Sequence, residues 1–283
     1  MTTIAIIGLG LIGGSIGEAL KNKGLASKII GIPRREETIG EAKQHTAIDE
    51  GTLDISKVSE ADIIFICTPL NLIIPKLKEM MPYLKNGAVV TDVGSSKQQI
   101  VSQAEKIMKK GCFFVGGHPM AGKEKTGISV SDPGLFNERT WILTETTDTN
   151  QDALRLLQHF IDSLGAKVVI LDPKAHDEAV AAISHLPLAI AAALVNTIAT
   201  QEGKDAMIKC AASGFRDTTR VASGDPVLGR DMFTTNKTAV IKMIKAYKQS
   251  LTEIEKLVKE GKADAILAKL KEAKEFRDQI YNG

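Results

Sequence analysis

The chain has 283 residues, a length that allows one large domain or two modest ones, each with its own hydrophobic core. Hydrophobic residues make up 43% of it and charged residues 25%, proportions that are ordinary for a globular protein. Its 36 basic and 34 acidic residues leave a net charge of +2, and aromatic residues account for only 4%. This composition argues against a surface for nucleic acid or for an anionic membrane.

The three cysteines, Cys67, Cys112 and Cys210, lie far apart and match neither a metal-binding spacing nor a disulfide framework. A sparse, odd number of cysteines is typical of a reducing compartment. The chain begins with a strand-like run instead of a signal peptide, and we find no run of about 18 apolar residues. We therefore expect a cytoplasmic protein with no membrane-spanning segment and no bound metal.

Short apolar runs alternate with amphipathic stretches up to about residue 171. The runs predict strands at residues 4–8, 28–32, 63–67, 88–92, 113–117, 141–144 and 168–171. Between them, residues 13–23 and 70–84 have the pattern of helices. Such an alternation predicts an α/β fold, with a parallel sheet covered by helices on both faces.

The pattern changes after Asp172 and Pro173, where strand-like runs give way to helical periodicity. Apolar residues then recur at steps of three and four, at Val240, Ile244, Tyr247, Leu251, Ile254 and Val258, and again at Ile266, Leu270, Ala273 and Ile280. We expect an all-helical second domain over residues 172–283, after a first domain over residues 1–171. Pro187 is expected to kink its first long helix.

A glycine motif, Gly8-Leu9-Gly10-Leu11-Ile12-Gly13, follows the first predicted strand and opens the first predicted helix. In this setting it predicts a Rossmann-like dinucleotide-binding domain. Gly8 permits the tight turn, Gly10 lets the backbone approach the pyrophosphate, and Gly13 lets helix and strand pack closely. The helix N-terminus would stabilise the phosphates. The alternative is a glycine-rich turn with a structural role only.

The end of the second predicted strand indicates which dinucleotide is bound. An NAD enzyme usually has an acidic residue there, which holds the ribose hydroxyls. Here Pro33 occupies that position, and Arg34 and Arg35 follow it. Guanidinium groups bind phosphate through paired hydrogen bonds, so we expect NADP, with NAD as the weaker cofactor. The alternative is a pair of solvated surface arginines.

Parallel sheets bind ligands beyond the carboxyl ends of their strands, which here are residues 68–69, 92–97 and 116–122. The last of these segments holds His118, preceded by two glycines and followed by Pro119. A neutral imidazole there could accept a proton from a substrate hydroxyl while a nicotinamide takes a hydride. By spacing alone, a turn or capping histidine fits equally well.

Four segments resemble the prephenate/arogenate dehydrogenase family. They are Gly-Gly-His-Pro-Met-Ala-Gly at residues 116–122, Thr-Asp-Val-Gly-Ser-Ser-Lys at 91–97, Ser-His-Leu-Pro at 184–187 and Gly-Phe-Arg-Asp-Thr-Thr-Arg at 214–220. They occur in the family's order and approximate spacing, and the resemblance covers nearly the whole chain. It implies a Rossmann-like domain followed by a helical dimerisation domain, and a homodimer, which the long apolar helical stripes also favour.

The resemblance implies a role for four residues. His118 would bind the ring 4-hydroxyl of the substrate and act as the catalytic base, and Ser95 would hydrogen-bond the same hydroxyl. Arg220 would bind a substrate carboxylate, and His185 would lie near the substrate. In this reaction a hydride leaves C4 toward NADP and loss of the C1 carboxylate aromatises the ring, so a base and good positioning suffice.

Each role has a structural alternative. His185 fits a core histidine on an apolar helix, and Ser95 fits the cap of a helix that starts at Ser96 or Lys97. Arg220 fits a residue that only pairs with Asp217. If His118 is the base, the activity should fall at low pH with an apparent pKa of roughly 6.5, the value of a free histidine.

The substrate is either prephenate or arogenate, which carries an ammonium where prephenate has a keto group. Lys123 follows the histidine segment, where an acidic residue is associated with arogenate in plant members of the family, so it favours prephenate if it points inward. Gly229 and the Pro-Arg-Arg segment are more similar to cyanobacterial arogenate enzymes. We expect prephenate, with arogenate as the alternative.

Two other classes of protein share parts of this pattern. One is another β-hydroxyacid-type dehydrogenase or an imine reductase, which would have the same plan without the Gly-Gly-His-Pro loop. The other is a protein that binds NADP without catalysis, which would turn over neither cyclohexadienyl acid.

Overall fold

The computed structural model describes residues 2–123 and 125–282. Its internal contacts divide the chain into two compact units, Met1–Lys237 and Thr238–Gly283, and each is described by itself. This division does not test the predicted domain boundary near residue 171, which was placed where the strand pattern changes to a helical pattern. That boundary stays a prediction.

Six parallel strands form the main sheet of the first unit. They are β1 (Thr3–Ile7), β2 (Lys28–Ile32), β3 (Glu50–Gly51), β4 (Ile63–Ile66), β5 (Val89–Asp92) and β6 (Phe113–Val115), in the order β3-β2-β1-β4-β5-β6. The direction of the strand order reverses between β1 and β4. In a doubly wound sheet, ligands bind outside the carboxyl ends of the strands at this point of reversal.

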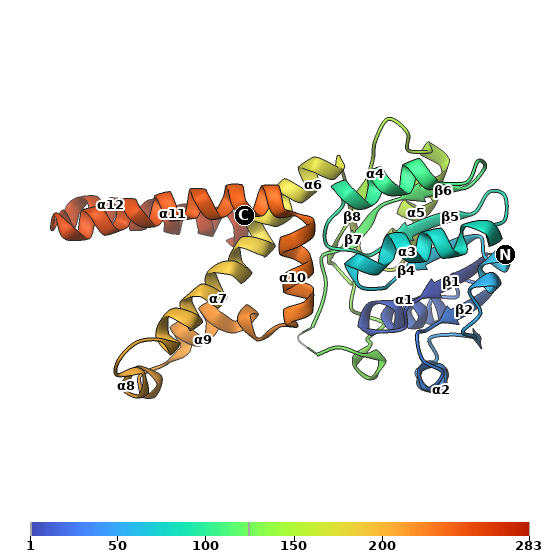
Figure 1. Cartoon of the computed structure of the whole chain (residues 1–283), viewed down its shortest axis with the longest axis horizontal. Coiled ribbons are helices and arrows are strands. Elements are labelled where there is room, and N and C mark those ends of the chain that lie inside the picture. The colour runs from blue at the N-terminus through green and yellow to red at the C-terminus, as the bar shows by residue number, and fades with distance from the viewer. Residues whose placement is uncertain (1, 124, 283) are drawn as a thin grey trace. The chain divides into compact units, whose positions relative to one another are not determined.

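Helices cover both faces of this sheet, as the sequence predicted (Figure 1). Successive residues of β1 alternate between two cores: Ile4 and Ile6 belong to one and Ala5 and Ile7 to the other. The first core includes residues of α1 (Leu11–Asn22), α2 (Glu37–Gln44) and α5 (Gln151–Ser163), and the second includes residues of α3 (Leu70–Met80) and α4 (Gln98–Ile107). Burial on both faces explains why these strands are continuously apolar.

One expectation about the sheet is wrong. The predicted strand at residues 113–117 is interrupted at Gly116. Strand β6 ends before this glycine and β7 (Gly117–Pro119) begins after it. A Cβ at Gly116 would lie 2.5 Å from Oγ1 of Thr144, so this close approach requires glycine. Strand β7 pairs antiparallel with β8 (Thr140–Thr144), which pairs parallel with β9 (Lys167–Leu171), and these three form a second sheet.

The rest of the first unit is helical. It contains α6 (Pro173–Val180), a π-helical turn (Ala181–His185), α7 (Leu186–Ala199), α8 (Lys204–Lys209), α9 (Ser213–Thr219) and α10 (Pro226–Thr235). Short 3-10 turns occur at Ile55–Glu60, Met81–Tyr83, Ile128–Val130 and Arg220–Ser223. A π-helical turn lies just before Pro187, which supplies no N–H for a regular helical hydrogen bond, and the kink expected at this proline stays a prediction.

The helix that runs through this turn, Pro173–Ala199, is long and apolar enough by length and composition to cross a membrane. The expectation that no stretch is long and apolar enough is therefore wrong for this helix, whereas the expectation of no membrane span is not contradicted. A core helix of a soluble protein passes the same test, so a single candidate is weak evidence for a span. The buried side chains of Asp177 and His185, which are 3% and 0% exposed, belong to this helix and face protein.

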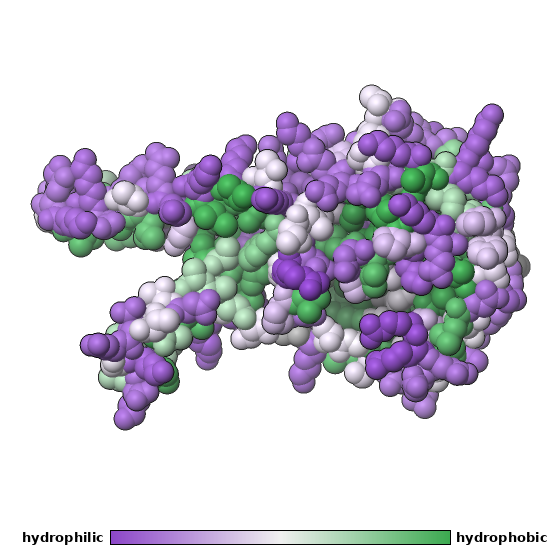
Figure 2. Space-filling model, viewed as in Figure 1, coloured by the Kyte–Doolittle hydropathy of each residue, from purple (hydrophilic) through white to green (hydrophobic). Residues whose placement is uncertain are grey.

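The second unit consists of two helices, α11 (Lys237–Lys259) and α12 (Ala263–Asn282), joined by a turn in which Gly261 has φ of 64°. Many of its large apolar side chains are exposed, among them Leu251, Ile254, Val258, Leu267, Leu270, Phe276 and Ile280. Figure 2 shows this apolar surface as green along one edge of the two helices. The predicted apolar stripes are therefore exposed over much of their length, whereas Val240 at the start of the first stripe is buried.

Candidate active site

The glycine motif forms the turn between β1 and α1. Gly8 has φ of +94°, and a Cβ there would lie 2.5 Å from the carbonyl oxygen of Cys67. A Cβ at Gly13 would lie 2.0 Å from the carbonyl oxygen of Gly8, so the packing of the chain itself requires both glycines. A Cβ at Gly10 would meet nothing within 4 Å. The open space beside Gly10, at the N-terminus of α1, fits the pyrophosphate of a dinucleotide.

Arg34 and Arg35 lie between the end of β2 and the start of α2, and both are exposed. Within the described residues, neither guanidinium group has a hydrogen-bond or ion-pair partner. Pro33, which precedes them, is buried and carries no carboxylate. Two cations therefore stand after β2, where an adenosine ribose and its 2′-substituent would lie, and the exposed carboxylates of Glu36 and Glu37 follow them at the start of α2.

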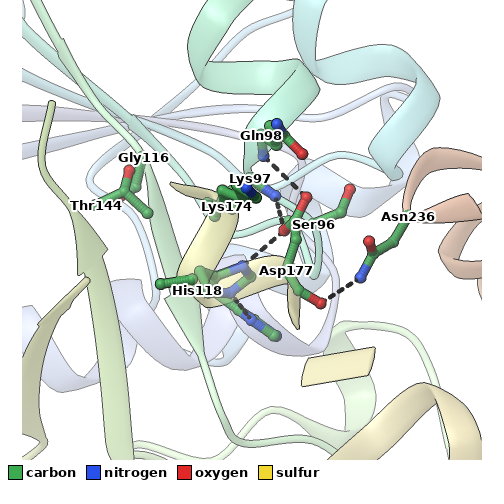
Figure 3. A network of polar contacts seen from close by, with 12 residues as sticks. Ser96, Lys97, Gln98, Gly116, His118, Thr144, Lys174, Asp177 and Asn236 are labelled. Carbon is green, nitrogen blue, oxygen red and sulfur yellow. Dashed lines mark hydrogen bonds and ion pairs between the residues drawn. The ribbon is translucent and has the colours of Figure 1, made fainter. Parts of the chain in front are cut away.

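His118 lies in β7 and is 8% exposed. Its Nδ1 is 2.8 Å from Nε2 of His176, and Nδ1 of His176 is 2.8 Å from Oδ1 of Asp177. His176 is fully buried and Asp177 is 3% exposed. These three side chains form a hydrogen-bonded row that ends at the carboxylate, and part of it appears in Figure 3.

The carboxylate of Asp177 also stands at the start of α4. Its Oδ1 accepts a hydrogen bond from the backbone N–H of Lys97 at 2.7 Å, and its Oδ2 accepts one from that of Gln98 at 3.0 Å (Figure 3). Asp177 thus satisfies the N–H groups that the helix itself leaves unpaired. Ser95 does not cap this helix, which removes one structural alternative for that residue.

Ser95 is 8% exposed, and its Oγ has no hydrogen-bond partner among the described residues. In the same part of the chain, two further buried polar atoms of predicted site segments lack a partner, Oγ1 of Thr68 and Nε2 of His185. Buried polar groups are normally hydrogen-bonded. These three atoms therefore fit a polar ligand that completes their hydrogen bonds.

His185, the last residue of the π-helical turn, is fully buried. Its Nδ1 is 3.4 Å from Nδ2 of Asn236, which also donates to the backbone carbonyl of Asp177 at 2.7 Å. His185 is therefore a buried histidine held on one side only. A purely structural role in the core would explain why His185 is buried. It would not explain why its Nε2 lacks a hydrogen-bond partner among the described residues.

A buried ion pair supports the segment that carries His118. Lys97 and Asp92 are both fully buried, and the Lys97 ammonium pairs with Oδ2 of Asp92. Oδ2 of Asp92 also accepts from the backbone N–H of Gly94 at 2.8 Å, and Oδ1 accepts from that of Gly117 at 3.2 Å. Asp92 thus links the end of β5 to the residue before His118.

Burial determines the protonation of the two site histidines. The loss of solvation, together with neighbouring His176, Lys97 and His185, holds the pKa of His118 well below its ordinary value. Burial lowers the pKa of His185 to about 4, against the opposing charge of Asp177. Both imidazoles are therefore neutral at physiological pH, and the pKa of the His118 imidazole lies below the 6.5 of a free histidine.

Two residues of interest lie on the surface. Arg220 begins the 3-10 turn after α9 and is exposed, and Asp217, its expected partner, pairs with Arg216 at 3.0 Å between Nε and Oδ1. Nζ of Lys123 lies 3.1 Å from Oδ2 of Asp132 and donates to the carbonyl of Val130 at 3.3 Å. Lys123 thus has an anionic partner nearby that offsets its charge, and its effect on a substrate ammonium stays a prediction.

His176 and Asp177 were missed in the sequence, as was the pairing of Lys97 with Asp92. A possible signal was the His-Asp pair just inside an apolar helix, since buried charged residues are rare unless they are paired. What each side chain contacts depends on segments far away in the chain, which spacing does not reveal.

A doubly wound parallel sheet, a glycine turn at its first helix and a neutral buried histidine beyond its strands define a nicotinamide-dinucleotide dehydrogenase. Comparison with known families gives the particular one. The prephenate dehydrogenase nucleotide-binding domain matches residues 16–170, and the prephenate dehydrogenase dimerization domain matches residues 172–272. The chain belongs to the prephenate dehydrogenase family, and its reaction class is that of prephenate and arogenate dehydrogenases.

Curated relatives agree with this assignment. The chain is 34% identical to the prephenate dehydrogenase of Bacillus subtilis over 281 residues, which are 98% of this chain and 76% of that protein. It is 28% identical to the cyclohexadienyl dehydrogenase of Zymomonas mobilis, over 97% of this chain and 94% of that protein.

Solved structures are similar over their whole length. A prephenate dehydrogenase from A. aeolicus, in complex with hydroxyphenyl propionate and NAD+, superposes with a TM-score of 0.93 at 35% identity, covering 99% of this chain and 98% of that one. The arogenate dehydrogenase of Synechocystis superposes with a TM-score of 0.87 at 36% identity, covering 98% and 99%. A 3-hydroxyisobutyrate dehydrogenase at 15% identity and a TM-score of 0.53 shares the fold alone.

Proposed function

We propose that this enzyme oxidatively decarboxylates prephenate to 4-hydroxyphenylpyruvate with NADP, in the synthesis of tyrosine, and that His118 is its base. The observation that carries the proposal is the neutral, buried imidazole of His118, whose Nδ1 is held by His176. Its Nε2 makes no hydrogen bond to a residue in the described part of the chain and is available to a substrate.

Each residue of the proposed site has its own role in the reaction. Nε2 of His118 takes the proton of the ring 4-hydroxyl, and the unpartnered Oγ of Ser95 bonds the same hydroxyl. When bound, the nicotinamide supplies the acceptor for the hydride that leaves C4. Departure of the C1 carboxylate as carbon dioxide aromatises the ring and leaves the C4 oxygen as a phenolate, which takes the proton back from Nε2 of His118 and becomes the 4-hydroxyl of the product.

Two residues are proposed to hold the substrate from the helical segment. Neutral His185 offers Nε2, which is buried and has no partner within residues 2–123 and 125–282. Arg220 is proposed to bind a substrate carboxylate, since its guanidinium matches the geometry of a carboxylate. Its exposed position suits a residue that meets ligand and not core.

NADP is proposed as the preferred cofactor, on the glycine turn of Gly8, Gly10 and Gly13 and on Arg34 and Arg35. The two arginines have no acidic partner in the described residues, and Pro33 replaces the acid that an NAD enzyme uses. The related A. aeolicus enzyme was solved with NAD+, which makes NAD the necessary comparison in any test.

Arogenate is the second candidate substrate, favoured by the similarity to the Synechocystis arogenate dehydrogenase. Because Lys123 is paired with Asp132, its charge supports prephenate less than the sequence suggested. The deciding experiment measures kcat/KM for prephenate and arogenate, each with NAD and NADP. We expect the highest value for prephenate with NADP, and a higher value for arogenate would overturn the choice of substrate.

We further propose that the enzyme is a cytoplasmic homodimer assembled through its helices. The exposed apolar side chains of α11 and α12 need a partner surface, and the dimerization-domain match spans residues 172–272. The apolar helix Pro173–Ala199 lies within that range, so we assign its surface to subunit contact and not to lipid.

A further inference from the structure

We propose that His176 and Asp177 are positioning residues that fix the tautomer of His118, so that Nδ1 carries the hydrogen and Nε2 carries the reactive lone pair. This inference rests on the proposed role of His118 as the base, and it names two residues that act on the reaction only through that imidazole. It follows from which atoms of the row can donate and which can only accept a hydrogen bond.

The row starts at an acceptor. Both oxygens of Asp177 accept backbone N–H bonds, from Lys97 at 2.7 Å and from Gln98 at 3.0 Å, an arrangement that fits an ionised carboxylate. An ionised carboxylate has no hydrogen to donate. Nδ1 of His176, which is 2.8 Å from Oδ1, must therefore carry the hydrogen of that bond.

The assignment then passes from one ring to the next. We take His176 as a neutral ring, in which one nitrogen donates and the other accepts, so Nε2 of His176 accepts. Its neighbour at 2.8 Å, Nδ1 of His118, must be the donor. His118 is neutral because burial holds its pKa well below the ordinary value, so its remaining nitrogen, Nε2, has a free lone pair. The opposite tautomer would present an N–H to the substrate hydroxyl and could not take its proton.

The same row also serves the charged form of His118. When the hydroxyl proton bonds to Nε2, the O–H bond breaks and the imidazolium keeps its Nδ1 hydrogen, which remains bonded to His176. The Asp177 carboxylate behind His176 stabilises that positive charge. No proton has to leave the row, and no oxidant beyond the dinucleotide is required.

The test reads the tautomer directly. The chain contains only five histidines, so selective 15N-histidine labelling of the full-length protein gives few long-range 1H–15N correlations. Without any ligand, we expect His118 to be an Nδ1–H imidazole at neutral pH. His176→Gln keeps an amide oxygen that can accept from His118, and His176→Leu removes the acceptor. We expect the wild-type pattern in the glutamine variant and loss of the single tautomer in the leucine variant.

Activity gives an independent readout. We expect His176→Leu to lower kcat by about 10²-fold, within the range for impaired base catalysis, with a small change in KM for prephenate and recovery in His176→Gln. His159→Gln is the matched control, because His159 is exposed on α5 and should alter neither readout. If the leucine variant does not fold, His176→Met replaces it as a side chain with little acceptor strength.

An Nε2–H tautomer in the wild type, or an unchanged Nδ1–H tautomer in the leucine variant, would overturn the proposal. A failure of the proposed function looks different. The expected tautomer would then be seen in a protein that does not turn over prephenate, which supports the positioning role and removes only the assigned reaction.

Discussion

Lys97 and Asp92 form an ion pair in which both side chains are completely removed from solvent. The two residues of the pair contact both the strand of His118 and the row behind it. Asp92 accepts a hydrogen bond from the backbone N–H of Gly117, and the backbone N–H of Lys97 donates to Asp177. Gly117 precedes His118, and Asp177 ends the row behind it. The two residues of one buried ion pair therefore contact both the strand that carries His118 and the carboxylate at the end of its hydrogen-bonded row.

The first prediction concerns that pair. Lys97→Met leaves the carboxylate of Asp92 buried without its cation, which should lower the free energy of unfolding by about 3–5 kcal/mol. Urea unfolding at neutral pH measures it. Lys76→Met is the matched control, because it removes the exposed pair with Glu79 and should cost less than about 1 kcal/mol. If both variants lose the same free energy of unfolding, the buried pair stabilises the fold no more than an exposed pair does.

The second prediction concerns the base. His118→Asn keeps polarity and much of the size but cannot take the proton, so kcat should fall by about 10² to 10⁴. The affinity for the dinucleotide, measured by fluorescence titration, should hardly change, since the phosphates are proposed to bind at Gly10 on a different segment. An asparagine variant with near-normal kcat would remove His118 from the mechanism, and His185 would be tested next.

The third prediction concerns pH and activity. Because burial lowers the pKa of His118, its imidazole stays neutral below the range in which a free histidine is protonated. The acid limb of kcat/KM should therefore lie below pH 6.5, to the extent that activity follows this group. A pH profile of the wild type checks this, with His159→Gln as a control. A limb at or above the ordinary histidine value would mean that another group controls the reaction.

The fourth prediction concerns pH and stability. The folded pKa of His185 is about 4, and its ordinary value is 6.5, so between these values the unfolded chain takes up a proton that the folded protein does not. The free energy of unfolding should therefore fall as the pH drops from 6.5 toward 4, by a few kcal/mol. Urea midpoints across this window measure the slope. In His185→Gln the slope should flatten, and an unchanged slope would contradict the assignment.

The fifth prediction concerns the cofactor. Replacing both Arg34 and Arg35 with alanine should raise KM for NADP by about tenfold or more, since a charge-assisted phosphate contact contributes about 1.5–3 kcal/mol. KM for NAD, which has no 2′-phosphate, should stay nearly constant. Equal losses with both cofactors would mean that the arginines support the fold and not the choice of dinucleotide.

Local patterns were sufficient for much of the fold. The strands β1, β2, β4 and β5 were predictable because each is an apolar run buried on both faces, and α1 follows from the glycine motif. The interruption at Gly116 was not predictable, since the close contact there involves Thr144, a residue of another strand. The two-residue strand β3 is too short to leave a pattern.

The site was predictable only in part. His118 and Ser95 lie in segments that the sequence already identified as candidate site segments, and the structure shows both side chains to be buried. The row behind His118 joins residues 58 positions apart, and the cap on α4 joins residues 80 positions apart. Such pairs are created by tertiary packing, which no spacing within a single segment encodes. The position of Arg220 on the surface leaves its role as a prediction.

The π-helical turn at Ala181–His185 takes up one residue more than regular α-helical winding would within the helix Pro173–Ala199. Each residue of a regular helix advances the side-chain direction by about 100°, so eight regular steps from Asp177 would place His185 about 80° away from it. In the structure Asn236 contacts both residues, at 2.7 Å to the carbonyl of Asp177 and at 3.4 Å to Nδ1 of His185. Deleting one residue of the turn would leave seven regular steps, close to two full turns, and should keep His185 on the side of Asp177, whereas inserting a residue should rotate it away. The turn therefore holds an extra residue without disturbing the alignment of the site.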